Sequence, residues 1–168
     1  MLIGLGSNRD RPVERLAEAV GRLAPEVEVL AASSVYRSEP VGHREQPDFY
    51  NAVVRGRTEL EPGELLARLH AVEEAMGRRR TFRNAPRVID LDLLACGDRV
   101  VETPALLLPH PRMAERAFVL VPVAEVAPEW RHPLLGRTAR ELLAEAGTLE
   151  RIERWGRLPP GGSRPAAG

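Results

Sequence analysis

Apolar residues recur along this chain with two spacings, one typical of helices and the other of strands. Repeats every three or four residues, several of them bounded by proline or glycine, predict helices. The segments with this spacing are residues 12–24, 62–77, 113–121 and 138–146. Short apolar or alternating runs predict strands over residues 2–5, 27–36, 49–58 and 88–95.

The four strands and the first two helices follow the order strand, helix, strand, strand, helix, strand. That order predicts an α+β fold of the ferredoxin-like class, an antiparallel sheet with helices on one face. A turn at Gly97-Asp98 predicts a hairpin that returns through residues 99–101. At 168 residues the chain is most simply one domain, expected over residues 1–155, with a disordered Pro/Gly-rich tail over 156–168.

The strand predicted over residues 88–95 carries two aspartates, Asp90 and Asp92, among isoleucine and leucine. Residues two apart on a strand share a face, so both carboxylates point the same way. Carboxylates are costly to desolvate beside apolar neighbours, and two side by side repel each other. Mg²⁺ suits this pair because it binds carboxylates together with substrate phosphates. Taken alone, the pair is also compatible with two solvated carboxylates or an ion pair with arginine.

Five arginines precede the aspartates in a loop that also holds glycine, asparagine and proline. They are Arg78, Arg79, Arg80, Arg83 and Arg87. A carboxylate metal site beside flexible guanidinium groups is typical of phosphoryl-type transfer, because the metal bridges phosphate oxygens and arginine binds them bidentately. On its own, such a run is equally compatible with a solvated charged surface.

Two further segments carry residues that would complete a site if the fold brought them together. The segment LPHPRMAERAF holds His110, Arg112, Arg116 and Phe118, and QPDFYNA holds Phe49 and Asn51. Two rings at stacking distance would hold a flat heterocycle, and an asparagine amide both donates and accepts along its edge. The sequence alone leaves their proximity open.

Charge and cysteine content narrow the possible partners. The 24 basic residues, all arginine, equal the 24 acidic ones, so nothing indicates a general nucleic-acid footprint or a polybasic membrane address. The single cysteine, Cys96, forms no internal disulfide, and no apolar run approaches the roughly 20 residues of a spanning helix. We therefore expect a cytoplasmic protein with no signal peptide and with neither nucleic acid nor membrane as a partner.

Six motifs, in order over roughly residues 2–145, resemble the 6-hydroxymethyl-7,8-dihydropterin pyrophosphokinase family. They are IGLGSN, SSVYRSEPVG, QPDFYNAVV, E-x-x-x-G-R-x-R from Glu73 to Arg80, RNAPRVIDLDLL and PHPRMAERAFVLVP. The resemblance implies an ATP-dependent diphosphotransferase of folate biosynthesis. It would move the pyrophosphoryl group of ATP to the hydroxymethyl oxygen of the dihydropterin and release AMP.

The same resemblance assigns roles to individual residues and implies a monomer. Asp90 and Asp92 would hold two Mg²⁺ ions that arrive with ATP. The catalytic residues would be Arg78, Arg87, Asp90 and Asp92. ATP would be bound by Glu73, Arg78, Arg80, Arg87, His110 and Arg116. The pterin would be bound by Ser38, Val41, Gly42, Phe49, Asn51 and Phe118, with the rings of Phe49 and Phe118 on its two faces.

The Arg-rich loop departs from the family pattern, because it lacks a tryptophan that many relatives carry. We expect residues 78–86 to form a lid that ATP orders, with Phe82 as its apolar contact. Pro111 also stands where a tyrosine often follows the histidine. Two other functions fit parts of the sequence: a metal-dependent phosphohydrolase using the same aspartates, and an RNA-binding ferredoxin-like module. The neutral charge and the lack of an aromatic-rich strand motif speak against the second.

Overall fold

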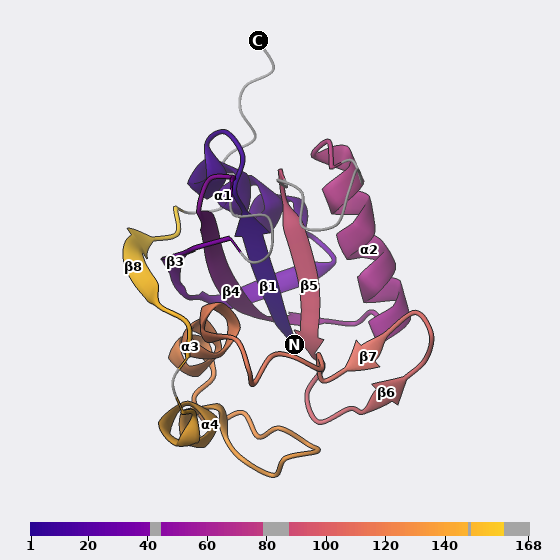
Figure 1. Cartoon of the computed structure of the whole chain (residues 1–168). Coiled ribbons are helices and arrows are strands. Elements are labelled where there is room, and N and C mark those ends of the chain that lie inside the picture. The colour runs from indigo at the N-terminus through magenta and orange to yellow at the C-terminus, as the bar shows by residue number, and fades with distance from the viewer. Residues whose placement is uncertain (41–44, 79–87, 148, 160–168) are drawn as a thin grey trace.

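The computed structural model describes residues 1–40, 45–78, 88–147 and 149–159. Its centre is one antiparallel sheet (Figure 1). Five strands lie in the spatial order β5 (Asp90–Ala95), β1 (Leu2–Ser7), β4 (Phe49–Thr58), β3 (Ser34–Ser38) and β8 (Ile152–Arg157). A sixth strand, β2 (Val27–Ala32), pairs with the end of β4 that β3 does not reach. This arrangement confirms the predicted α+β, ferredoxin-like fold.

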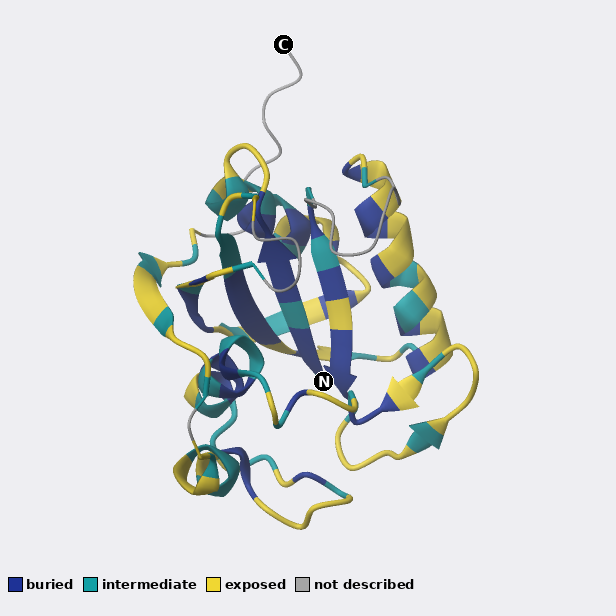
Figure 2. Cartoon of the chain, in the orientation of Figure 1, coloured by how far each residue is buried: buried dark blue, intermediate teal, exposed yellow. Residues whose placement is uncertain are grey.

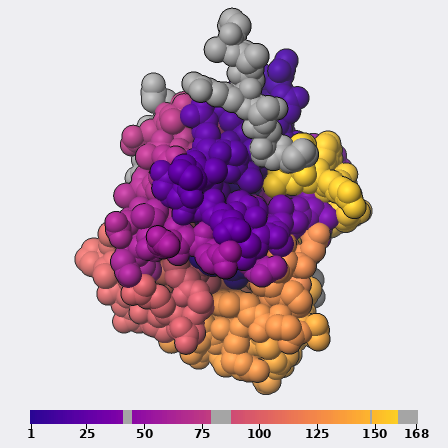
Figure 3. All heavy atoms as spheres, turned by 180° about the vertical axis from the view of Figure 1, so that it is seen from behind, coloured from indigo at the N-terminus to yellow at the C-terminus, as the bar shows by residue number. Residues whose placement is uncertain are grey.

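Helices α1 (Pro12–Arg22) and α2 (Pro62–Ala75) cover one face of the sheet, as predicted. Their leucines pack against the strand residues that point to this face, and together they form the main core. Figure 2 shows that α2 is buried on the side toward the sheet and exposed on the other. In Figure 3 the molecule is seen from behind, where the N-terminal half of the chain, indigo to magenta, forms the upper part of the surface.

The opposite face carries α3 (Ala117–Val126) and α4 (Ala139–Glu145), so the expectation of helices on one face alone was wrong. Strand side chains alternate between the two faces, and Leu2, Val53 and Leu94 point away from the main core. They form a second core with Val123 and Val126 of α3. Helix α3 packs over only part of this face (Figure 1). A pocket lies on the remainder.

The strand predicted over residues 27–36 is divided at Ser33. The Ser33 backbone N–H donates to the Val53 carbonyl at 2.9 Å, and its hydroxyl oxygen accepts from the Val53 N–H at 2.9 Å. Ser33 is therefore held by β4 without continuing either ladder. Strands β2 and β3 consequently pair with different parts of β4.

The C-terminal third differs more from expectation. The hairpin predicted after Gly97 does not return to β5, because β6 (Val101–Glu102) pairs instead with β7 (Leu107–Leu108). The helix expected near residues 113–121 begins later, at Ala117, and Met113 is buried within a turn that precedes it.

Strand β8 was not predicted. Gly156 and Arg157, which the sequence analysis placed in a disordered tail, pair with β3. Residues 160–168 lie outside the described part of the chain. In the ranges that the structure describes, no helix combines the length and apolarity needed to cross a membrane.

Candidate active site

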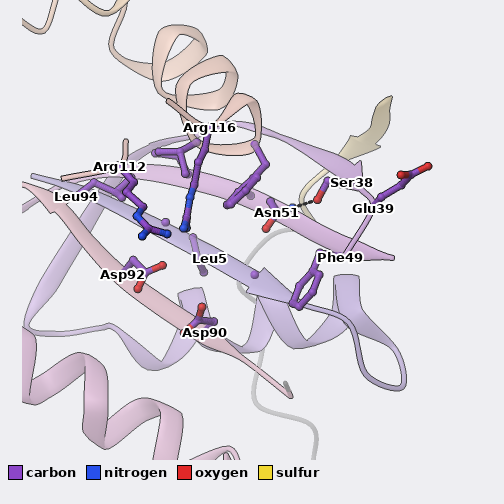
Figure 4. A pocket seen from close by; sticks show the side chains of 16 residues that line it. Leu5, Ser38, Glu39, Phe49, Asn51, Asp90, Asp92, Leu94, Arg112 and Arg116 are labelled. Carbon is purple, nitrogen blue, oxygen red and sulfur yellow. Dashed lines mark hydrogen bonds between the residues drawn. The ribbon is translucent and has the colours of Figure 1, made fainter. Parts of the chain in front are cut away.

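A pocket lies on the open part of the sheet, between the strands and the start of α3 (Figure 4). Strands β1, β3, β4 and β5 form one side of the pocket, and Arg112 and Arg116 enter from the other side. Phe118, at the start of α3, also lines the pocket. The fold therefore brings together three segments that the sequence leaves apart: QPDFYNA, the aspartate strand and PHPRMAERAF.

The floor of the pocket is open because β1 has glycine at two successive positions of this face. Gly4 pairs with Asp92 and Gly6 with Asp90 in the antiparallel register of β1 and β5. Directly opposite residues share a face, so no side chain of β1 stands beside either carboxylate. A Cβ at Gly6 would lie 3.0 Å from the Asn51 Oδ1, which is tighter than ordinary contact. A side chain at position 6 would therefore push the Asn51 amide by a few tenths of an ångström.

Asp90 and Asp92 both line the pocket, as their spacing on a strand predicts. Asp90 is partly covered, and its Oδ1 lies 2.9 Å from a terminal guanidinium nitrogen of Arg78. Asp92 is exposed. The other face of the same strand buries Leu91 and Leu93 in the main core, which fixes the backbone that presents the carboxylates.

Glu73 and Arg78 continue this network beneath the pocket. Glu73 of α2 is only 4% exposed. Its Oε2 accepts from the Leu91 backbone N–H at 3.0 Å and from the Arg78 guanidinium, which also pairs with Asp90. Burial raises the pKa of Glu73, although the Leu91 amide and Arg78 oppose that effect. Arg78 thus stands between a buried carboxylate and a pocket carboxylate.

Arg116 and Phe118 lie at the beginning of α3 and contact each other. The Arg116 guanidinium carbon lies 5.6 Å from the centre of the Phe118 ring, within the range of a cation–π interaction. The backbone of His110 is attached to β5, because its N–H donates to the Leu94 carbonyl at 2.8 Å. Burial lowers the pKa of His110, and nearby Arg116 lowers it further, which favours the neutral ring.

The far end of the pocket holds the pterin-side residues predicted from sequence. Asn51 is 7% exposed, and its amide nitrogen donates to the Ser38 hydroxyl at 2.9 Å. Phe49 pairs with Ser38 in the register of β3 and β4, so both lie at the same rim. Figure 4 shows the Phe49 ring and the Asn51 amide on the same side of the sheet as the two aspartates.

The structure brings most of the predicted site residues that it describes into one pocket. Those that line the pocket are Ser38, Phe49, Asn51, Asp90, Asp92, Arg116 and Phe118. Glu73, Arg78 and His110 are not among the described lining residues, and Glu73 reaches the pocket only through Arg78. Val41, Gly42, Arg80 and Arg87 lie outside the described residues, as does the lid expected over 78–86 except for Arg78.

Three lining residues were missed by the sequence analysis. Gly4 was treated only as part of a strand and Gly6 only as part of the IGLGSN motif, although glycine at alternate positions indicates a strand face that must stay open. Arg112 was noted without a role, and it lies beside Arg116 in the pocket wall (Figure 4).

The chemistry of these groups fits a hard divalent cation carried by a phosphate ligand. Within the described ranges, no three His, Cys, Asp or Glu side chains converge in the manner of a dedicated protein metal cage. Two carboxylates on one strand match the way Mg²⁺ is commonly held, with phosphates and water supplying the remaining oxygens. The guanidinium groups of Arg112 and Arg116 face the same space and complement phosphate.

A family model for 7,8-dihydro-6-hydroxymethylpterin-pyrophosphokinase matches residues 2–128. The chain belongs to this family. Curated pyrophosphokinases of the family, each named 2-amino-4-hydroxy-6-hydroxymethyldihydropteridine pyrophosphokinase, are close relatives. The protein of Methylorubrum extorquens is 45% identical over 90% of this chain and 97% of its own length. That of Pseudomonas aeruginosa is 43% identical over 90% of this chain and 94% of its own length.

Longer relatives contain the pyrophosphokinase sequence as one part. A folic acid synthesis protein of Dictyostelium discoideum is 36% identical over 89% of this chain, which spans only 23% of that protein. The crystal structure of Plasmodium falciparum HPPK-DHPS with pteroate matches with a TM-score of 0.71 at 16% identity, over 86% of this chain and 41% of that one. That likeness supports the fold. Membership of the pyrophosphokinase family favours a diphosphotransferase over the phosphohydrolase and the RNA-binding module.

Proposed function

We propose that the chain transfers the pyrophosphoryl group of ATP to the hydroxymethyl oxygen of 6-hydroxymethyl-7,8-dihydropterin in folate biosynthesis. The observation that carries this proposal is the single pocket that joins paired carboxylates at one end to Phe49, Asn51 and Phe118 at the other. Such a pocket accommodates a metal-bound polyphosphate and a flat heterocycle side by side. Family membership supports the same reaction.

Asp90 and Asp92 would hold Mg²⁺, two ions arriving with ATP by the family resemblance. When bound, the metal would neutralise part of the negative charge on the phosphates of ATP. The two carboxylates point to one face of β5 and stand opposite glycines, so no side chain of β1 obstructs the oxygens of a bound phosphate.

Arg78 and Arg116 would contact the phosphates from two sides. Arg78 is held by Glu73 from below, which fixes where its guanidinium enters the site. Arg116 enters from the wall formed by α3. The proposal also includes Arg80 and Arg87 as phosphate ligands and a neutral His110 near the nucleotide, by resemblance to the family.

The pterin would lie between Phe118 and Phe49, with its edge toward Asn51. Because the Asn51 nitrogen donates to Ser38, its carbonyl oxygen is directed to the other side, where it can accept from a ring N–H or amino group. Backbone groups near Val41 and Gly42 belong to the same proposal. Aromatic faces and one oriented amide together favour a flat, hydrogen-bonding bicycle.

The reaction would proceed by positioning and charge neutralisation. The pterin hydroxymethyl oxygen attacks the β-phosphorus of ATP, a new P–O bond forms, and the bond from that phosphorus to the α–β bridging oxygen breaks. AMP leaves with the bridging oxygen, and the hydroxyl proton passes to solvent. Alignment of the two substrates in one pocket supplies much of the rate enhancement.

We further propose that the enzyme acts as a monomer in the cytoplasm. The single cysteine, Cys96, is consistent with a reducing compartment. Light scattering after size-exclusion chromatography measures the oligomeric state directly.

Product analysis tests the proposed reaction. Incubation with ATP, Mg²⁺ and the hydroxymethyl-dihydropterin should give AMP and a pterin diphosphate in equal amounts by chromatography and mass spectrometry. Release of inorganic phosphate that does not depend on the pterin would support a phosphohydrolase instead. Absence of turnover with ATP and the pterin would overturn the proposal.

A further inference from the structure

Helix α3 begins at the active-site wall without a cap of its own. Its N-cap residue is Arg116, whose side chain makes no capping hydrogen bond. The first backbone N–H groups of a helix have no partner within the helix, so something else must accept them. The Ala117 N–H, which lies between Arg116 and Phe118 in the chain, donates to the Glu150 carboxylate at 2.6 Å.

The segment that supplies this carboxylate continues directly into β8 at the edge of the sheet. The contact of Ala117 with Glu150 is the first attachment of this segment to α3. A second, indirect attachment runs from β8 through Ser34 of β3. The Arg154 guanidinium donates to the Ser34 hydroxyl at 2.8 Å, and the Ser34 hydroxyl donates to Glu125 near the end of α3 at 2.8 Å. Figure 1 shows β8, in yellow, beside β3 and reaching toward α3. Residues 149–157 thus contact the start of α3 directly and its end through Ser34 of β3.

Both attachments lie on the helix that carries Phe118. Phe118 and Glu125 are seven residues apart, so they lie on the same side of the helix about two turns from each other. Glu125 attaches the C-terminal end of α3 to β3, and Glu150 attaches the first turn, which carries Arg116 and Phe118. Among the described contacts, Glu150 is the one side chain that accepts from a backbone N–H of the first turn. Without Glu150, the Ala117 N–H would lose this acceptor.

We propose that Glu150 is a positioning residue for the Arg116–Phe118 turn. Glu150 lies beyond the family match, which ends at residue 128. The proposal rests on the proposed function where it takes Phe118 to contact the pterin. Glu150 acts through the helix start, and it does not itself line the described pocket.

Three substitutions separate this role from general stability. Glu150→Ala removes the acceptor and should raise the pterin dissociation constant about tenfold, because a misplaced contact residue loses its alignment. Glu150→Gln keeps an acceptor oxygen and should stay within about threefold of the parent protein. Glu153→Ala is the matched control: it lies in β8 and pairs with the exposed Arg37, so pterin binding should be unchanged.

The decisive comparison repeats Glu150→Ala in a Phe118→Ala background. If Glu150 acts through Phe118, the second substitution should add less than about twofold to the pterin dissociation constant. A full tenfold effect in both backgrounds would overturn the proposal, because it would make the two residues independent. Equal effects of Glu150→Ala and Glu150→Gln would also overturn it.

Hydrogen exchange in the ligand-free protein gives a readout that needs no substrate. Glu150→Ala should accelerate exchange in the peptide covering residues 116–120, while peptides of β1 and β4 should be unaffected. Unchanged exchange at α3 would overturn the positioning role. Accelerated exchange in a protein whose parent form binds no pterin would leave the positioning role intact and reject the proposed substrate.

Discussion

At the scale of single residues, the site is organised by charges that already have partners. The Arg78 guanidinium joins buried Glu73 to Asp90, so one pocket carboxylate is compensated before any substrate arrives. Mg²⁺ at the aspartates would replace this pairing and leave Arg78 available to phosphate. Asp92 is the more exposed of the two carboxylates. Its removal therefore disturbs the folded protein least while still deleting a proposed metal ligand.

Asp92→Ala should lower kcat more than about 100-fold, because the metal's charge neutralisation contributes several kcal/mol in sites of this kind. The free energy of unfolding should change little, since Asp92 is exposed. Steady-state turnover at saturating Mg²⁺ measures the first quantity and urea unfolding the second. Asp98→Ala, in the exposed turn after β5, is the matched control and should keep parental turnover. Near-normal turnover of Asp92→Ala would remove Asp92 from the metal site.

Phe118→Ala should weaken pterin binding by about 1–3 kcal/mol, the scale of stacking between an aromatic side chain and a base. The affinity for an α,β-methylene analogue of ATP should change much less. Calorimetry with each ligand separately measures both. Equal losses for the two ligands would mean that Phe118 supports the fold of the whole pocket.

At the scale of elements, β1 shows how a strand is shaped by the site it borders. Its inward positions Ile3 and Leu5 are buried in the main core, whereas the alternate positions Gly4 and Gly6 open the pocket floor. The two glycines differ in what a side chain would meet. A Cβ at Gly4 would lie 3.5 Å from a Leu94 methyl, an ordinary contact, but at Gly6 it would lie 3.0 Å from the Asn51 Oδ1.

Gly6→Ala should therefore displace the Asn51 amide and weaken pterin binding about tenfold, since an oriented amide loses its alignment. Gly4→Ala adds the same methyl to the same strand without approaching Asn51. Its effect on pterin affinity should be smaller, and its stability should be equal to or above that of the parent. Fluorescence titration with the pterin compares the two variants, and identical losses would contradict the assigned role of Asn51.

Elements with a strong apolar pattern could be predicted from sequence, and those held by polar contacts could not. Strand β4 was predicted with its observed bounds, because it begins with a short run of aromatic and β-branched residues directly after Pro47-Asp48. Strand β8 has mostly exposed side chains and is held by pairing to β3, which leaves no apolar pattern to detect. The start of α3 was misplaced because Met113 is buried in a preceding turn.

The candidate site divides in the same way. The aspartates and Phe118 line the pocket as the family motifs and the spacing of the aspartates led us to expect, and their roles in metal and pterin binding stay predictions. The links from Glu73 to Leu91 and from Glu150 to Ala117 join residues 18 and 33 positions apart, and only the folded chain makes them neighbours.

At the scale of the whole molecule, Glu125 connects the helix that carries Phe118 to β3, which lies 91 positions earlier in the chain. Its carboxylate accepts from the Ser34 N–H at 2.9 Å and from the Tyr36 hydroxyl at 2.6 Å. Burial alone would raise the pKa of Glu125, but the hydrogen bonds from Tyr36 and Ser34 outweigh it and lower the pKa below 4.5. Burial and the same contact raise the pKa of Tyr36 to about 12, so the hydroxyl remains a donor.

This link makes stability depend on pH in a defined direction. A carboxyl with a lowered pKa in the folded state contributes stability above its unfolded value, near 4.5, and loses it as pH falls through the folded value. The free energy of unfolding of the parent protein should therefore exceed that of Glu125→Gln at about pH 7, and the difference should shrink as pH falls to about 3. Urea midpoints of both proteins across this range measure the difference. A difference that stays constant below about pH 4.5 would show that the Glu125 charge is not engaged.

The most direct test of the central claim follows the α–β bridging oxygen of ATP. With this oxygen isotopically labelled, and with Mg²⁺ and the hydroxymethyl-dihydropterin present, mass spectrometry of the products locates the bond that breaks. Pyrophosphoryl transfer predicts that the label appears in AMP and that the pterin carries two unlabelled phosphates. Formation of ADP, or of inorganic phosphate without a pterin diphosphate, would contradict the account.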